Sequence, residues 1–197
     1  MAATSTEGDD LLRAVQLYRS LGFFDSFREL TNEDLAERLV DAYRAKTRGR
    51  GDLRRPSELR DLSLLALDTS RTWWEDMESD VFRGNEAYVR ILNQWAAISR
   101  GNFRPERIAE QWHSDQGPID VSFAVAGREI TWSTDVVEWI DERLLDTINT
   151  LILPTGVQFQ HFFTGDQSAF VVALTREERD AIARERPWNL DLSLDRY

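Results

Sequence analysis

The chain of 197 residues contains no cysteine, which excludes disulfide bonds, thiolate metal sites and thiol nucleophiles. It has only two histidines, His113 and His161, nearly fifty positions apart. No apolar run approaches the ~20 residues that a membrane-spanning helix needs. The first ten residues are small and acidic, without the basic start and apolar core of a secretory signal. We therefore expect a cytoplasmic protein that does not enter a membrane.

The motifs of common enzyme classes are missing as well. We find no Gly-x-Ser-x-Gly elbow, no His-Glu-x-x-His pair, no Walker loop and no Gly-x-Gly-x-x-Gly turn. No cofactor-binding or metal-binding motif is present, and we expect no cofactor. Internal repeats and linkers rich in Pro or Ser are absent too. We therefore expect a disordered tail over residues 1–8 and one continuous domain over residues 9–197.

Negative charge is in excess and unevenly spread. The net charge is −11. Residues 1–100 hold 15 basic and 18 acidic side chains, whereas residues 101–197 hold 9 and 17. Such a surface repels phosphate backbones, which argues against nucleic acid and favours a basic protein partner. A basic run over residues 44–55 is the exception, and it is either an anion contact or, more simply, a solvated loop.

The stretch over residues 119–186 organises the fold. Apolar residues alternate with polar ones over 119–125, which predicts a strand with one buried face. A two-residue turn at Ala126-Gly127 places Phe123 opposite Ile130 and Val121 opposite Trp132. All apolar side chains of this hairpin then lie on one face, so the pattern and the turn agree on one register.

A helix, a second hairpin and another helix follow. From Asp135 to Leu151 the apolar spacing becomes three and four, and Pro154 with Gly156 ends the helix. Residues 157–163 and 170–174 alternate again around a turn at 164–167. Thr175 and Glu178 form a capping box for the last helix.

The sequence therefore predicts an α+β fold. Its helical N-terminal half, residues 9–113, packs with a four-stranded, mainly antiparallel sheet in β-β-α-β-β-α order over residues 119–186. Within the helical half we expect helices over residues 9–21 and 31–47 and from residues 56 and 85, and a short one from Pro105 to Trp112.

One acidic segment stands out as a candidate binding surface. Two tryptophans and four carboxylates occur within eight positions. The members are Trp73, Trp74, Glu75, Asp76, Glu78 and Asp80. Exposed Trp beside carboxylates suits a partner rich in Arg or Lys. Two other interpretations stay open: a solvated acidic face with one Trp buried, or a helix on which Glu75 and Glu78 hold a hard cation.

His161 carries the competing enzymatic interpretation. Alternation places it on the apolar face of its strand, and Asp166 follows in the next turn. A small hydrolase could use His161 as general base with Asp166. A buried histidine with a structural role explains the same pattern, because no nucleophile is placed beside it.

Several strings resemble a group of uncharacterised bacterial proteins in the style of polymorphic-toxin immunity proteins. They are residues 64–68 (LLALD), 73–76 (WWED), 84–85 (GN) with Tyr88, 98–101 (ISRG), 139–141 (WID) with 148–149 (IN), and 169–175 (AFVVALT). The likeness spans about residues 9–190. It implies a small, acidic, cytoplasmic protein that binds one toxin and blocks it, and it assigns no catalytic residue.

Overall fold

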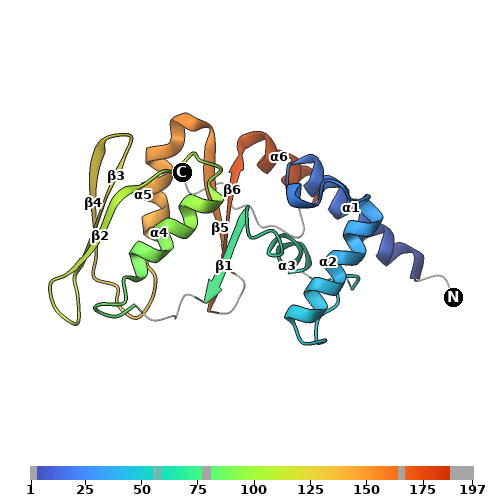
Figure 1. Ribbon diagram of the computed structural model, residues 1–197, viewed down its shortest axis with the longest axis horizontal. Coiled ribbons are helices and arrows are strands. Elements are labelled where there is room, and N and C mark those ends of the chain that lie inside the picture. Colours follow the sequence, from blue (N-terminus) through green and yellow to red (C-terminus); the bar gives the residue numbers. More distant parts are fainter. Residues whose placement is uncertain (1–3, 56, 58, 77–80, 164–166, 187–197) are drawn as a thin grey trace. The chain divides into compact units, whose positions relative to one another are not determined.

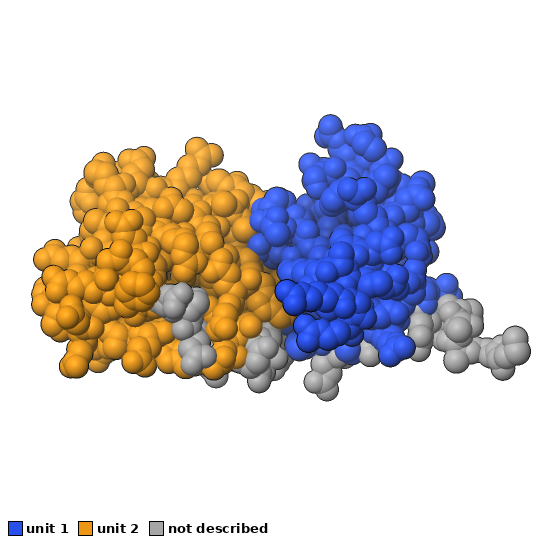
Figure 2. Space-filling model, turned by 60° about the horizontal axis from the view of Figure 1, so that its bottom comes forward, with its two compact units in different colours: residues 1–72, 177–197 blue, residues 73–176 orange. Residues whose placement is uncertain are grey.

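The computed structural model describes residues 4–55, 57, 59–76, 81–163 and 167–186 (Figure 1). The chain forms two compact units (Figure 2). Unit 1 comprises residues 1–72 and 177–197, and unit 2 comprises residues 73–176. Unit 2 is therefore an insertion between the two chain segments that build unit 1. The single domain expected over residues 9–197 stays a prediction. None of the described helices is both long and apolar enough to cross a membrane.

Unit 1 is helical. It contains α1 (Thr4–Ser20), the 3-10 helix η1 (Asp25–Phe27), α2 (Asn32–Lys46), α3 (Arg60–Leu65) and nearly all of α6 (Arg176–Glu185). The Thr31 hydroxyl accepts from the Asp34 amide at 3.1 Å and caps α2 as the sequence predicts. Helix α1 begins at Thr4, inside the tail expected to be disordered; residues 1–3 lie outside the described residues.

The core of unit 1 combines apolar side chains with a buried ion network. Apolar members include Leu11, Val15, Leu35, Leu39, Leu62, Leu64 and Ile182. Among them Asp61 is fully buried and accepts from the Tyr18 hydroxyl at 2.6 Å and from Arg186 Nε at 2.8 Å. Arg60 donates to Asp61 at 3.2 Å, and Asp10 binds both guanidinium groups. Side chains from α1 and α3 thus meet Arg186, the residue that follows α6, at one charged cluster.

Unit 2 has two sheets with two helices between them (Figure 1). One sheet is ordered β1 (Thr72–Asp76), β6 (Ser168–Thr175) and β5 (Val157–Phe163). The other is ordered β2 (Glu106–Trp112), β3 (Ile119–Val125) and β4 (Arg128–Thr134). Helices α4 (Ala87–Ile98) and α5 (Arg143–Ile152), with the 3-10 helix η2 (Leu153–Thr155), complete the unit. One core joins apolar residues of both sheets and both helices.

The β3–β4 hairpin confirms the predicted turn and register. Phe123 pairs with Ile130, and Val121 pairs with Trp132. Ala126 and Gly127 have φ of 51° and 78°, so both turn residues are left-handed. A type I′ turn requires this at both positions.

The predicted four-stranded sheet is wrong. The two hairpins belong to separate antiparallel sheets, and each sheet gains a third strand that the prediction lacks. Strand β2 covers residues 106–112, where the sequence predicts a helix from Pro105. Its half-buried residues Ile108, Glu110 and Trp112 alternate with exposed ones, which is the period of a strand. Strand β1 covers Thr72–Asp76, so the helical interpretation of the acidic segment is wrong there too.

The helix expected from Asp135 begins later, at Arg143. Asp141 explains the position of its first turn. Its Oδ1 accepts from the Arg143 amide at 3.1 Å, and its Oδ2 accepts from the Thr134 hydroxyl at 2.7 Å. Residues 135–142 therefore form a connecting segment in which Asp141 ties the end of β4 to the start of α5.

Candidate functional site

Strand β1 turns the two adjacent tryptophans to opposite faces. Trp73 is 5% exposed, and its Nε1 donates to Gln94 Oε1 at 2.9 Å. Its ring packs edge-on against the ring of Trp95, with 5.8 Å between the ring centroids. Trp74 is half-buried and packs edge-on against Phe170 at 5.9 Å. Trp73 is therefore a core residue, and only Trp74 presents part of its ring to solvent.

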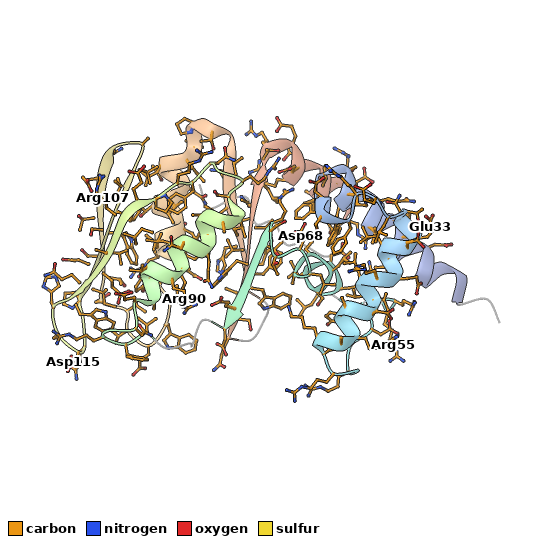
Figure 3. The ribbon with its side chains drawn as sticks, in the orientation of Figure 1. Glu33, Arg55, Asp68, Arg90, Arg107 and Asp115 are labelled. Carbon is orange, nitrogen blue, oxygen red and sulfur yellow. The ribbon has the colours of Figure 1, made fainter. Side chains whose placement is uncertain are left out.

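Glu75 ties β1 to α4. Its Oε2 accepts from Arg90 Nη1 and its Oε1 from Gln94 Nε2, both at 2.7 Å. Arg90 lies on α4 (Figure 3). With both oxygens engaged, Glu75 could bind a cation only by giving up these bonds. Asp76 is exposed, whereas Glu78 and Asp80 lie outside the described residues. Across the described part of the chain, no group of three His, Asp or Glu side chains could hold a metal ion.

His161 lies on β5 with its side chain 19% exposed and its Nε2 3.3 Å from Glu142 Oε2. Burial lowers its pKa to about 4, against the opposite effect of the Asp146 carboxylate. The imidazole is therefore neutral near pH 7 and is a weak base there, because a general base works best with a pKa near the working pH. Asp166, its predicted partner, lies outside the described residues.

The exposed face of the β2–β3–β4 sheet brings together a Ser, an Asp and a His. Asp120 Oδ1 accepts from the Ser133 hydroxyl at 2.5 Å, and Asp120 Oδ2 lies 2.7 Å from His113 Nε2. Both hydrogen bonds lower the pKa of Asp120, and the bond from Ser133 has the larger effect. The aspartate stands between the other two groups, so His113 does not contact the hydroxyl that it would have to deprotonate in a Ser-His-Asp triad. The cluster is a polar surface contact.

Three loops meet at one end of unit 2 and form what we call the loop cluster, residues 81–86, 113–118 and 135–142. The Glu138 amide donates to the Val81 carbonyl at 3.3 Å, and Arg83 donates to Asp115 at 3.1 Å. Gly117 has φ 82°, and a Cβ there would lie 3.3 Å from Val137 Cγ1. Figure 3 shows Asp115 at this end of the unit. Backbone and side-chain contacts thus hold the three loops together.

The loop cluster presents exposed aromatic rings among carboxylates. Phe82 is 57% exposed and Trp139 is 39% exposed. Aromatic side chains of this size are usually covered, and exposed examples point to an interaction surface. The three loops contain six acidic residues and one arginine, a balance of −5 with histidine counted as neutral. Five acidic members are exposed or half-buried: Glu86, Asp115, Asp135, Glu138 and Glu142. The sixth, Asp141, is buried and forms an ion pair with Arg143, the next residue after the third loop.

Two residues of the cluster have an uncommon backbone conformation. Glu86 has φ 53° and Glu138 has φ 76°, in the left-handed region that side chains other than Gly rarely adopt. Such conformations persist only where surrounding contacts hold them, and they gather at binding and catalytic sites. Each residue adjoins the cluster's aromatic segments, since Glu138 precedes Trp139 and Glu86 ends the loop that carries Phe82.

Sequence reasoning missed most of this site. The apolar spacing predicts Trp139 on a helix face, and no pattern marks Phe82 as a site residue. The neighbourhood of residues 81 and 138 arises only in the folded chain. By contrast, the pairing of Asp120 with Ser133 follows directly from the predicted hairpin register.

We found no family model, no curated protein and no solved structure that matches this chain. The resemblance to immunity proteins therefore stays a prediction, and the site must be judged on its geometry.

Proposed function

We propose that this protein is an acidic binding module of the immunity type, which binds one basic protein and blocks it. The observation that carries the proposal is the loop cluster, where the exposed rings of Phe82 and Trp139 lie on loops that carry five exposed or half-buried carboxylates and one arginine. Buried aromatic anchors supply most of the affinity in protein complexes, and surrounding charge speeds the encounter. A basic groove that holds nucleic acid would be a complementary target.

The candidate surface extends from the loop cluster towards the acidic segment that the sequence singles out. Val81 follows that segment directly in the sequence. Of the described members of the segment, Trp74 and Glu75 are half-buried and Asp76 is exposed. Trp73 supports the surface from the core, and Glu75 holds the strand on α4. Glu78 and Asp80 remain predicted members of the same surface.

The enzymatic alternatives gain no specific support. The low pKa of His161 makes it a poor base at neutral pH. The two oxygens of Glu75 are already bonded to Arg90 and Gln94.

Site-specific photocrosslinking tests the binding proposal while the identity of the partner is still open. A photoreactive phenylalanine analogue is placed at Phe82 in one variant and at Leu153 in the matched control. Leu153 is also in unit 2 and is 59% exposed, but it lies outside the loop cluster. We expect a basic protein to be trapped at position 82 and not at position 153, and the purified chain to inhibit that protein at equimolar ratio. Equal trapping at both positions, or a trapped protein that the chain does not inhibit, would refute the proposal.

Two variants of this surface separate the effect of its charge on association from the effect of its aromatic rings on dissociation. Glu138→Lys should slow association with the trapped partner, and added salt should shrink the difference, since screening at 0.1 M acts within ~10 Å. Trp139→Ala should instead speed dissociation, by on the order of 2 kcal/mol if the ring is an anchor. Surface plasmon resonance resolves the two rates.

A further inference from the structure

Strand β4 is an edge strand of its sheet, and no described strand pairs with its outer side. The two sheets of unit 2 have four edge strands, β1, β5, β2 and β4. An unprotected edge presents unpaired N–H and C=O groups that can pair with another chain. Proteins usually protect an edge strand by keeping it short, by placing charged side chains or a β-bulge in it, or by covering it with another element. Three of these four strands show such a device.

The protecting devices differ from strand to strand. Asn149 of α5 covers the β5 edge, since its side-chain amide donates to the Phe159 carbonyl at 3.0 Å and accepts from the Phe159 amide at 2.7 Å. Strand β2 is broken by an irregularity between Glu106 and Ala109, where Arg107 has φ 51°. Strand β1 has only five residues and ends in Glu75 and Asp76.

Within the described part of the chain, strand β4 shows none of these devices. It pairs with β3 in unbroken register over seven residues and contains neither Gly nor Pro. Its two charged residues, Arg128 and Glu129, stand at the turn end, and Glu129 forms an ion pair with Arg107 across the sheet. Ser133 is bonded to Asp120 of β3. The Glu129 and Ser133 side chains are therefore directed to β2 and β3 rather than to the open edge.

The hairpin geometry identifies the unpaired backbone groups. In a hairpin with a two-residue turn, the residues that flank the turn form a hydrogen-bonded pair, and such pairs alternate along the ladder. Starting from the pair Val125–Arg128, the residues of β4 bonded to β3 are Arg128, Ile130, Trp132 and Thr134. The amides and carbonyls of Glu129, Thr131 and Ser133 therefore point outward. Among the described residues none of them has a backbone partner outside the β3–β4 ladder.

We propose that β4 pairs with β4 of a second copy of this chain, antiparallel, about a two-fold axis at Thr131. In this register Thr131 lies opposite Thr131 and Glu129 opposite Ser133. The backbone N–H and C=O groups of all three residues point outward. The Thr131–Thr131 pair and the two Glu129–Ser133 pairs can therefore each exchange two backbone hydrogen bonds, about six in total. The two three-stranded sheets then join edge to edge into one continuous sheet.

Side-chain pairing in this register is favourable. Ile130 lies opposite Trp132 of the other copy, and both side chains are half-buried in one copy alone. Aromatic and β-branched side chains stabilise each other as cross-strand pairs. No two like charges face each other, because Arg128 lies opposite Thr134. Because Ile130 and Trp132 of one strand meet Trp132 and Ile130 of the other, the strand is complementary to itself, which favours a second copy over an unrelated peptide.

The dimer and the proposed partner complex should respond to salt in opposite directions. Each copy carries a net charge of −11, so two copies repel and added salt weakens that repulsion. Binding of an acidic surface to a basic partner weakens with salt. The inference does not depend on the proposed function, and either can fail alone.

The test is sedimentation equilibrium of the full chain over a range of concentrations and two salt concentrations. We expect a mass approaching twice 22.8 kDa, with tighter association at the higher salt. Thr131→Pro removes an outward N–H and leaves the β3 ladder intact, so it should weaken dimerisation about tenfold or more. Thr131→Val keeps the N–H and should dimerise as the wild type does.

Two further variants keep the test decisive if Thr131→Pro fails to fold. Thr131→Lys places two ammonium groups opposite each other only in the proposed register, so it should abolish the dimer. Because the chain has no cysteine, Thr131→Cys offers a single thiol. A short bismaleimide should link two Thr131→Cys chains but not two Ser122→Cys chains, which carry the thiol on the same face of β3. A monomeric wild type, or a dimer that Thr131→Lys leaves unchanged, would overturn the proposal.

Discussion

Asn in place of Asp61 tests the buried ion network of unit 1. The Asp61 carboxylate is 0% exposed and accepts from Tyr18, from Arg60 at 3.2 and 3.3 Å, and from Arg186 at 2.8 and 3.1 Å. Asp61→Asn keeps the shape but removes the charge, so the buried Arg60 and Arg186 guanidinium groups lose the carboxylate that both of them contact. Removing one partner from a buried ion pair costs about 3–5 kcal/mol. That is a large part of the ~5–15 kcal/mol that stabilises a typical domain.

The measurement is urea unfolding followed by circular dichroism, with hydrogen exchange to locate the effect. We expect Asp61→Asn to lower the free energy of unfolding by about 3–5 kcal/mol and to raise exchange in α1 and α3. Tyr18→Phe removes one hydrogen bond and should cost about 1 kcal/mol. Asp180→Asn, at an exposed position of α6, should change stability by no more than ~0.5 kcal/mol. A loss below about 1 kcal/mol in Asp61→Asn would show that hydrophobic packing alone holds these segments together.

Three other contacts lead to measurable effects on stability. The Arg186 and Arg60 guanidinium groups hold the pKa of Asp10 well below its usual range, so its stabilising effect is present above about pH 4 and declines below it; Arg186→Gln should reduce this acid sensitivity in unfolding experiments. Burial lowers the pKa of His161 from 6.5 to about 4, so this group does not reduce the stability of the folded state above pH 6.5. Between pH 6.5 and 4 the unfolded state takes up a proton that the folded state does not, which lowers the free energy of unfolding by roughly 3 kcal/mol in all. The free energy of unfolding of His161→Leu should lack that part of the pH dependence. Asn149→Ala should destabilise unit 2 by about 1–3 kcal/mol, because two β5 backbone groups lose their partner, and should increase hydrogen exchange at Phe159.

The parts of the fold that the sequence predicts well are those in which two local signals agree. The β3–β4 hairpin has both a period-two pattern and a tight turn, and its register is confirmed at Phe123 and Val121. The N-cap at Thr31 likewise follows from short-range chemistry. Neither feature depends on residues far away in the chain.

The errors arise where a local signal is ambiguous. Pro105 suits the first turn of a helix but equally the residue before an edge strand, and the strand period of residues 106–112 decides the case. The segment that holds Trp73 and Trp74 is compatible with a helix or a strand. As a strand it sends the two adjacent side chains to opposite faces, which buries Trp73 and leaves Trp74 half-buried. The hairpins form two sheets because α4 and α5 bury one apolar face on each side, a three-layer arrangement that no single stretch of sequence encodes.

The candidate site is predicted by the sequence only in its general character. Acidic side chains beside aromatic rings are present, but the exposed rings are those of Phe82 and Trp139 rather than of Trp73. The contact between residues 81 and 138 joins segments more than fifty positions apart. Periodicity and composition carry no information about such a contact.

The interrupted course of unit 1 along the chain has a consequence for the order of folding. Asp10 and Arg186 are bonded although 176 positions separate them. On a ribosome that adds about 5–20 residues per second, α1 must wait on the order of ten seconds before its Arg186 partner is made. All of unit 2 is synthesised in the interval and can bury its own core first. The N-terminal helices meanwhile carry Asp10 and Asp61 without Arg186, so unit 1 can be completed only after all of unit 2 has been synthesised.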